Sequence, residues 1–166
     1  IVGLAPGVQG ANRTGRPFTG DFAGDLLYGT LLESAFARGT YNARPDDGLE
    51  LTGAMITNAV RCVPPQNKPT PAETKTCLGF LVSRIATLPN LTAILALGHI
   101  AHNAVLSARN IKKSGAPFGH GAQHDLGGKI RLFDSYHCSR YNTNTRRLTP
   151  DMFRSVFADI RAYLDR

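Results

Sequence analysis

The chain has 166 residues, of which 42% are hydrophobic and 19% charged, and its net charge is +7. This length suits one domain with a single core, and no apolar run is long enough to span a bilayer, so we expect one soluble domain over residues 1–166. The positive charge favours a polyanionic partner such as nucleic acid or an acidic membrane face, although many basic proteins bind neither.

The chain begins at Ile1 without an initiator methionine, directly in a strand-like run, so we expect an N-terminal segment of the protein to precede it. A signal peptide cannot be read for the same reason. The three cysteines, Cys62, Cys77 and Cys138, are an odd count that argues against a disulfide framework and for a reducing compartment.

Strand-like and helix-like segments alternate along the chain. Short apolar runs predict strands over 1–5, 55–60, 91–97 and 130–133. Apolar residues at helical spacing predict helices over 22–36, 71–87, 99–109 and 150–164, and a turn-rich stretch covers 38–48. Thr70 and Thr149 each precede a proline, which is the pattern of an N-cap with proline at the first helical position.

This alternation is typical of an α/β fold whose parallel sheet is covered by helices on both faces. In such sheets ligands bind beyond the carboxyl ends of the strands. The polar segments of the chain all follow predicted strands, at 5–21, 61–69, Gly98 and 134–147. We therefore expect a polar cleft at that edge of the sheet.

The first polar segment is rich in glycine, but it has neither the Gly-Lys-Ser/Thr ending of a P-loop nor the Gly-x-Gly-x-x-Gly spacing of a dinucleotide site. Nucleoside triphosphate hydrolysis is therefore not expected. Asp21 stands at the start of a predicted helix, where a capping role is as good an interpretation as a catalytic one. His137 is close in sequence to Ser139, Arg140 and Asn142, which are donors suited to phosphates, yet an isolated loop histidine is more often only solvated.

Three segments carry a resemblance to a known family: GLAPG with NRTGRPFTGD, ITNAVRCVPPQNKPTP, and SYHCSRYNTNTRRLT. In this order, and over nearly the whole chain, they resemble the motifs of the iron-sulfur uracil-DNA glycosylases, closest to the family 5 (UDGb-type) enzymes. The resemblance implies a three-layer α/β/α sandwich with a central, mainly parallel four-stranded sheet. It also implies an enzyme that flips uracil out of DNA and hydrolyses its N-glycosidic bond, leaving an abasic site.

The resemblance assigns the base-binding residues. Phe18 would stack on the flipped base, and Asn58 would read its edge, since an amide can donate to O4 and accept from N3–H. Gly7 and Gln9 would complete this set.

The catalytic set implied by the resemblance is Asp21, Asn67 and His137. Asp21 would act on the water or on the cationic sugar, with Asn67 as a second polar group, and His137 would donate to O2 of the departing uracil. The division is physically sensible, because the leaving group gathers negative charge while the sugar gathers positive charge.

The implied DNA-binding positions are polar, basic or aromatic: Arg61, Lys68, Ser139, Arg140, Tyr141, Asn142, Arg146 and Arg147. Residues 140–142 would enter the duplex and fill the vacated space. Leu4 replaces a glutamate of family 4, and Gln9 stands where a close family 5 relative would carry histidine. Asn58 is closer to family 4, which favours uracil over a broader range of bases.

Cys62 and Cys77 match two of the four thiolates that hold a [4Fe-4S] cluster in this family, and the other two would lie upstream of Ile1. Their spacing alone favours two small buried residues. Cys138 is not expected to bind iron, and no nucleotide cofactor is expected.

The resemblance also implies the setting: a monomer in a bacterial or archaeal cytoplasm, acting on chromosomal DNA that contains uracil or another deaminated base, with no membrane partner. A non-catalytic basic α/β module that binds nucleotide or nucleic acid is the alternative, since it would use the same loops without Asp21 or His137. An electron-transfer iron-sulfur protein fits the polar loops poorly.

Overall fold

Five strands form one sheet in the order β4-β1-β5-β7-β6. The computed structural model describes residues 1–166, and the chain divides into two units. The sheet unit contains Ile1–Ala5 and Thr57–Tyr136, and the loop unit contains Pro6–Ile56 and His137–Arg166. The expectation of a single domain stays a prediction.

The strands β1 (Val2–Gly3), β4 (Thr57–Asn58), β5 (Ala93–Leu97) and β7 (Arg131–Ser135) are parallel to one another. The first three lie within predicted strand segments, whereas β7 overlaps the predicted 130–133 and extends to Ser135. Residues 94–97 of β5 are all buried. A continuous apolar run is what a parallel strand covered on both faces requires. The mainly parallel α/β fold class is thereby confirmed.

The predicted number of four strands is wrong, because β6 (Gln123–Asp125) pairs antiparallel with β7 at the edge of the sheet. Its sequence, QHD, has no apolar pattern, and Gln123 and Asp125 are exposed. A polar edge strand of this kind is held by the backbone of its neighbour, so hydrophobic periodicity does not reveal it.

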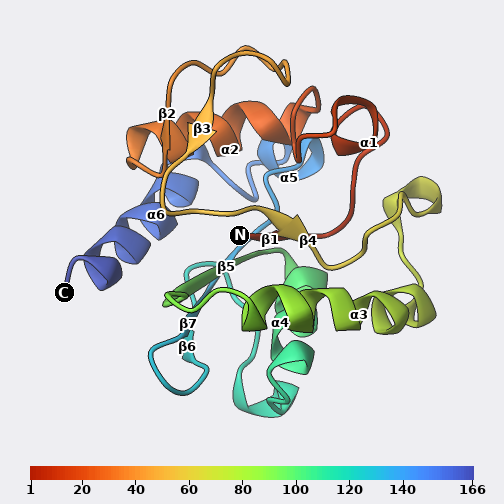
Figure 1. Ribbon diagram of the computed structural model, residues 1–166, viewed down its shortest axis with the longest axis vertical. Helices are drawn as coiled ribbons and strands as arrows, with labels where there is room; N and C mark the ends of the chain where they lie inside the picture. The colour runs from red at the N-terminus through yellow and green to blue at the C-terminus, as the bar shows by residue number, and fades with distance from the viewer. The chain divides into compact units, whose positions relative to one another are not determined.

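Helices α3 (Pro71–Ala86) and α4 (His99–Ala108) belong to the sheet unit, with α4 against β1 and β5 and α3 against α4 (Figure 1). Thr70 caps α3 in a capping box with Glu73, as its sequence predicts. Short 3-10 turns η1 (Pro65–Asn67) and η2 (Lys113–Gly115) lie in the connections. The core between these elements includes Leu81 of α3, Val105 of α4 and Leu132 of β7.

In the loop unit, α2 (Phe22–Glu33) packs against α6 (Pro150–Leu164). The two predicted helices are confirmed, although α2 ends at Glu33 because Ala35 has a left-handed backbone with φ of 58°. Phe36 follows and makes an edge contact with Phe157 of α6 at 6.1 Å between ring centroids. A hairpin of β2 (Ala37–Arg38) and β3 (Glu50–Leu51) encloses the turn-rich stretch.

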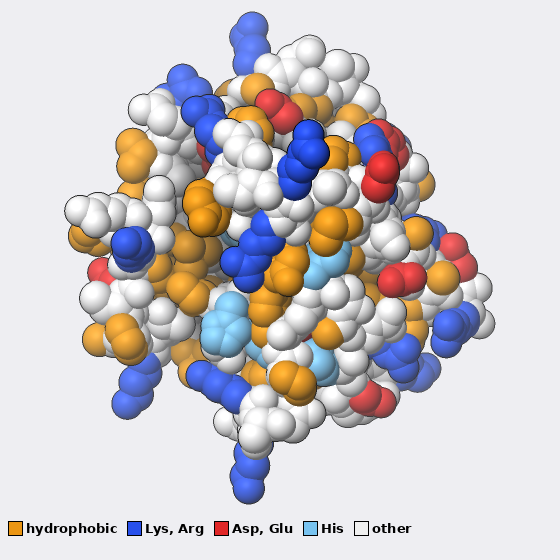
Figure 2. Space-filling view, turned by 180° about the vertical axis from the view of Figure 1, so that it is seen from behind, with side chains coloured by type: hydrophobic (Ala, Val, Ile, Leu, Met, Phe, Trp, Pro, Cys, Tyr) orange, Lys and Arg blue, Asp and Glu red, His pale blue; other side chains and the backbone are white.

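Two further short helices, α1 (Ala11–Thr14) and α5 (Arg140–Asn144), lie in segments that the sequence predicts as loops. No helix in the structure combines the length and the apolar character needed to cross a membrane. On the face shown in Figure 2, Lys and Arg side chains are spread among hydrophobic and histidine side chains.

A polar cluster of three side chains is enclosed in the sheet unit. Asp134 on β7 lies 2.8 Å from His102 Nδ1 and 3.2 Å from His124 Nε2, measured to its two carboxylate oxygens. The Asp134 and His102 side chains are 0% and 1% exposed. His102 Nε2 donates to the Ala116 carbonyl at 2.9 Å. The network satisfies these polar groups where water cannot reach them.

We expect Asp134→Ala to lower the free energy of unfolding by about 3–5 kcal/mol, because it leaves the buried His102 imidazole and the partly buried His124 imidazole without their shared partner. Denaturant titration followed by circular dichroism measures the change. Asp159→Asn, at an exposed position of α6, is the control and should leave the midpoint nearly unchanged. Equal effects of the two substitutions would show that the network contributes nothing.

Candidate functional site

Phe18 and His137, far apart in the sequence, meet in the loop unit. Their ring centroids are 5.9 Å apart and their planes are tilted by 37°. Phe18 is 7% exposed, although it stands in an otherwise polar stretch. The structure therefore places the predicted stacking residue next to the predicted donor to the base.

Asp21 is the N-cap of α2, and its carboxylate accepts a hydrogen bond from Gly24 N at 3.2 Å. The capping interpretation is thus confirmed. Two glycines of the first loop crowd the same carboxylate: a Cβ on Gly10 would overlap it, and one on Gly7 would lie 3.2 Å from Oδ2. The absence of side chains at Gly7 and Gly10 is what leaves room for the acid.

Burial raises the pKa of Asp21, and the neighbouring Asp25 adds to this, while hydrogen bonds from the Gly24 and Ala23 amides work in the opposite direction. A desolvated carboxylate is a stronger base and a stronger electrostatic partner for a cation than one in water. Asp21 can therefore cap the helix and still act on a substrate.

His137 is half-buried, and its Nδ1 is buried without a hydrogen-bond partner. Burial lowers the pKa of the imidazole from 6.5 to about 4, so the ring is neutral at pH 7. The buried Nδ1 sets this residue apart from a fully solvated loop histidine. A buried, unpaired ring nitrogen is typical of groups that await a ligand.

The segment that follows His137 is ordered by its own side chains. Asn142 Nδ2 donates to the His137 carbonyl at 2.8 Å, and Ser139 caps α5 by accepting from Asn142 N. Arg140 lies over the Phe22 ring at 5.1 Å, whereas Tyr141 is 72% exposed. Of the predicted DNA-binding residues, Asn142 and Ser139 thus also have structural partners, and Tyr141 projects outward.

Arg146 and Arg147 complete the predicted DNA-binding set in this unit, and both are exposed. Gln9, predicted to contact the base, is exposed, and its carbonyl accepts from Arg13 Nε at 3.1 Å. These positions are open to a large ligand.

The remaining predicted residues lie in the sheet unit. Asn58 is on β4, paired in register with Gly3 of β1, and its side-chain Oδ1 is buried without a partner. Asn67 and Lys68 are exposed at the η1 turn, where Asn67 has a left-handed φ of 56°. Arg61 is exposed and places its guanidinium 5.3 Å from the centre of the Phe80 ring on α3.

Cys62 and Cys77 also lie in the sheet unit, and neither forms a disulfide. Cys62 is exposed in the segment after β4, and Cys77 is buried on α3, one turn before Phe80. The Arg61 contact with Phe80 holds that segment against α3. These two free thiols could supply two ligands of an iron-sulfur cluster, which needs four.

Cys138 does not extend this set, since it lies in the loop unit and burial raises the pKa of its thiol to about 12. His102, His124 and Asp134 are another group that offers metal-ligand atoms, all within 4.8 Å of one another. In the structure these atoms hydrogen bond to each other.

Arg16 and Asp47, which no sequence pattern singles out, form a bidentate ion pair with two contacts of 2.8 Å. The pair joins the first loop to the turn-rich stretch 31 residues later. A local sequence pattern cannot show that two residues 31 positions apart will pair. The only signal for a role of Arg16 is its position two residues before Phe18.

The fold and these side chains define an α/β protein with a mainly parallel sheet, in which polar segments follow β1, β4 and β7. The model of the uracil DNA glycosylase superfamily matches residues 1–161. The chain therefore belongs to the uracil DNA glycosylase superfamily.

Individual relatives refine this placement. A type-5 uracil-DNA glycosylase of Thermus thermophilus is 46% identical over 97% of this chain and 73% of its own length. A type-5 enzyme of Mycobacterium bovis is 42% identical over 97% of this chain and 61% of its own length. A type-4 uracil-DNA glycosylase of Thermotoga maritima is 32% identical over 96% of this chain and 72% of its own length. The predicted resemblance to family 5 is confirmed, and the chain spans 61–73% of these relatives.

We expect the His137 ring to titrate near pH 4 rather than near 6.5, because burial disfavours the imidazolium. Between these values the unfolded chain binds a proton that the folded chain does not, so this residue makes stability fall as the pH drops from 6.5 to 4. Nuclear magnetic resonance of the imidazole protons measures the midpoint. An ordinary midpoint would contradict this desolvation of the ring.

Proposed function

We propose that this chain carries the active site of a DNA repair glycosylase that flips uracil out of DNA and hydrolyses its N-glycosidic bond. Uracil-DNA glycosylase is the activity named for the superfamily and for the relatives. The observation that carries the proposal is the pairing of an aromatic ring, Phe18, with a neutral, unpartnered imidazole, His137. A planar base that develops negative charge suits these two neighbours.

The proposed chemistry divides charge between two sides of the scissile bond. As the bond between C1′ and N1 breaks, the electron pair leaves with uracil, and an N–H of the neutral His137 donates to its O2. The sugar becomes cationic, and Asp21 stabilises it, orients the water that attacks C1′ and accepts the proton that this water loses. Asn67 is a second polar group for this water. Glycoside hydrolysis in general follows this pattern of charge.

Base recognition is assigned to Phe18, Gly7, Gln9 and Asn58. The buried Oδ1 of Asn58 lacks a partner in the protein, which is costly unless a ligand supplies the hydrogen bond. Uracil N3–H is a suitable donor, and the amide N–H₂ group can donate to O4.

DNA contacts are assigned to the exposed basic and polar residues, which carry little sequence information because they contact phosphates. The exposed Tyr141 ring is the proposed group that enters the duplex beside the flipped base. The proposed setting is that of a monomer in a bacterial or archaeal cytoplasm. Asp21 and His137 are both desolvated. A module that only binds nucleic acid does not require desolvated titratable groups, so we prefer the enzyme to the non-catalytic alternative.

We expect His137→Ala and Asp21→Asn each to slow uracil excision by about 10²-fold or more, the usual loss when one group that stabilises developing charge is removed. Single-turnover release of uracil from a labelled oligonucleotide isolates the chemical step. Asp159→Asn is the control and should react at the original rate. Unchanged rates for both variants, with the unmodified protein active, would remove these residues from the mechanism.

We further propose that Cys62 and Cys77 supply two of the four thiolates of a [4Fe-4S] cluster, with the other two outside this chain. The thiols are free and lie on adjoining segments, and that supports the assignment. Such a cluster would tie the segment after β4 to α3. No step of the excision reaction passes through it.

In the full-length protein, purified without oxygen, we expect Cys77→Ser or Cys62→Ser to abolish bound iron and the broad visible absorption of the cluster. Iron analysis and absorption spectroscopy measure both. Cys138→Ser is the matched control and should retain the iron. Full iron content in the Cys62 and Cys77 variants would refute the assignment.

A further inference from the structure

Phe18 has a backbone conformation that a bulky residue rarely adopts. Its φ is 58°, in the left-handed region, and its side chain is 7% exposed. Such a conformation is unfavourable by itself and persists only where the surrounding structure enforces it. The structure must therefore contain contacts that hold Phe18 in place.

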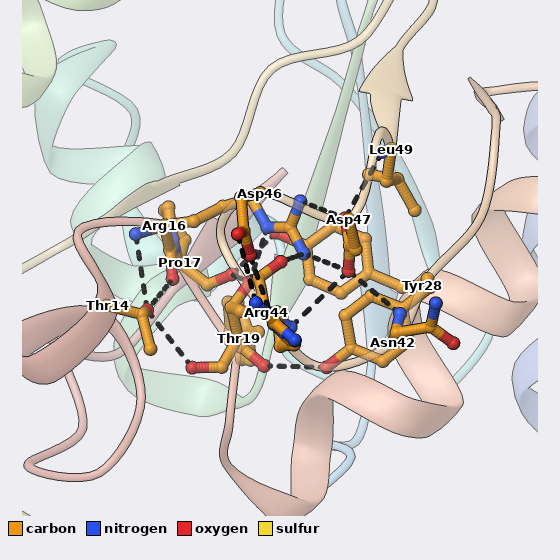
Figure 3. Close-up of polar contacts among 12 residues, drawn as sticks. Thr14, Arg16, Pro17, Thr19, Tyr28, Asn42, Arg44, Asp46, Asp47 and Leu49 are labelled. Carbon is orange, nitrogen blue, oxygen red and sulfur yellow. Dashed lines mark hydrogen bonds and ion pairs between the residues drawn. The ribbon is translucent and has the colours of Figure 1, made fainter.

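Three consecutive residues around this position are each held by a different side chain. Tyr28 Oη donates to the Pro17 carbonyl at 2.6 Å, and Arg16 Nε donates to Thr19 Oγ1 at 2.6 Å (Figure 3). Tyr41 Oη donates to the Phe18 carbonyl at 3.4 Å. The loop is thus fixed on both sides of the aromatic ring and at its own backbone.

Arg16 connects these contacts. Its guanidinium lies 5.2 Å from the centre of the Tyr28 ring and 5.7 Å from that of Tyr41, and the two rings stack at 4.7 Å. A planar guanidinium beside two aromatic rings gains from cation–π attraction and from its rigid fork of donors. The placement of Arg16 therefore determines where both tyrosine hydroxyls and Thr19 are held.

Asp47 in turn fixes Arg16. Its two carboxylate oxygens each lie 2.8 Å from a guanidinium nitrogen, and the Asp47 side chain is 1% exposed. Backbone amides of Asn42, Arg44 and Leu49 also donate to this carboxylate, as Figure 3 shows. These bonds, with that from Arg16 the strongest, hold the pKa of Asp47 well below its ordinary value. The lowered pKa favours the ionised carboxylate that the bidentate pair requires.

We propose that Arg16 and Asp47 are positioning residues that set the orientation of Phe18 for stacking on the flipped base. The turn-rich stretch between β2 and β3 then has a function. Its backbone amides hold the Asp47 carboxylate, which holds Arg16 and thereby the loop that carries Phe18. The proposal rests on the proposed function, because it presumes that Phe18 stacks on the base. Neither residue touches the substrate.

A purely structural ion pair in the same hairpin offers a matched comparison. Arg38 and Glu50 pair at 2.6 Å across β2 and β3, but their side chains are 77% and 63% exposed. Exposed pairs of this kind contribute little to stability. Glu50→Gln therefore removes an ion pair from the hairpin without affecting the loop that carries Phe18.

The test compares Asp47→Asn, Arg16→Lys and Glu50→Gln in single-turnover excision of uracil, together with affinity for undamaged DNA. Loss of the bidentate pair should slow excision by about 10- to 100-fold, since small displacements of a positioning group have effects of that order. Affinity for undamaged DNA should change by less than about threefold, because phosphate contacts set it. Glu50→Gln should retain the original rate.

The decisive readout is a double-mutant cycle with Phe18→Leu, which keeps apolar bulk but removes the ring. If Arg16 and Asp47 act through Phe18, Asp47→Asn should cause almost no further loss of rate in the Phe18→Leu background. A merely structural role would instead slow both backgrounds equally, and this result would overturn the proposal. Rates are compared at a temperature where circular dichroism shows each variant folded, and Arg16→Lys replaces Asp47→Asn if the latter does not fold.

The outcomes separate the two proposals. If the unmodified protein releases no uracil, the proposed function fails. If the unmodified protein is active and both Asp47→Asn and Arg16→Lys retain its rate, only the positioning role fails.

Discussion

The ion pair between Arg16 and Asp47 is the interaction on which the loop unit depends. A carboxylate that is 1% exposed is costly to remove from water, and Arg16 together with three backbone amides offsets this cost. The same contacts close the stretch between β2 and β3 and order the loop that carries Phe18. Rigidity in that loop lowers the entropy lost when a ligand binds to it.

A second constraint is the desolvation of two titratable groups, Asp21 and His137. Burial raises the pKa of the carboxylate and lowers that of the imidazole, so desolvation favours the neutral form of each. Asp21 offsets part of this effect through the first-turn amides of α2, whereas His137 has no such partner. The helix amides thus stabilise the anionic form of Asp21 against desolvation, whereas the His137 ring is neutral at pH 7. This difference matches the positive and negative sides of a breaking glycosidic bond.

In the sheet unit, the constraint is that buried polar side chains need hydrogen-bond partners within the protein. Asp134 on β7 satisfies two histidines at once, and His102 also reaches the Ala116 carbonyl. A network of this kind specifies one packing arrangement, because each alternative leaves a buried group unpaired. The register of β7 against β5 is thereby fixed in the strand that leads to residue 137.

Local sequence determined the parallel strands and the four longer helices, as the N-caps Thr70 and Thr149 and the buried run of β5 show, but not the short helices α1 and α5. It also singled out Phe18, Asp21 and His137 as candidates through their motifs, since motif residues lie within a few positions of one another. It did not reveal β6, the left-handed backbone at Phe18 or the burial of His137 Nδ1. Nor did it reveal the pairing of Arg16 with Asp47. Propensity and periodicity act over a few residues, whereas burial and the choice of an ion-pair partner depend on groups that only the folded chain brings together.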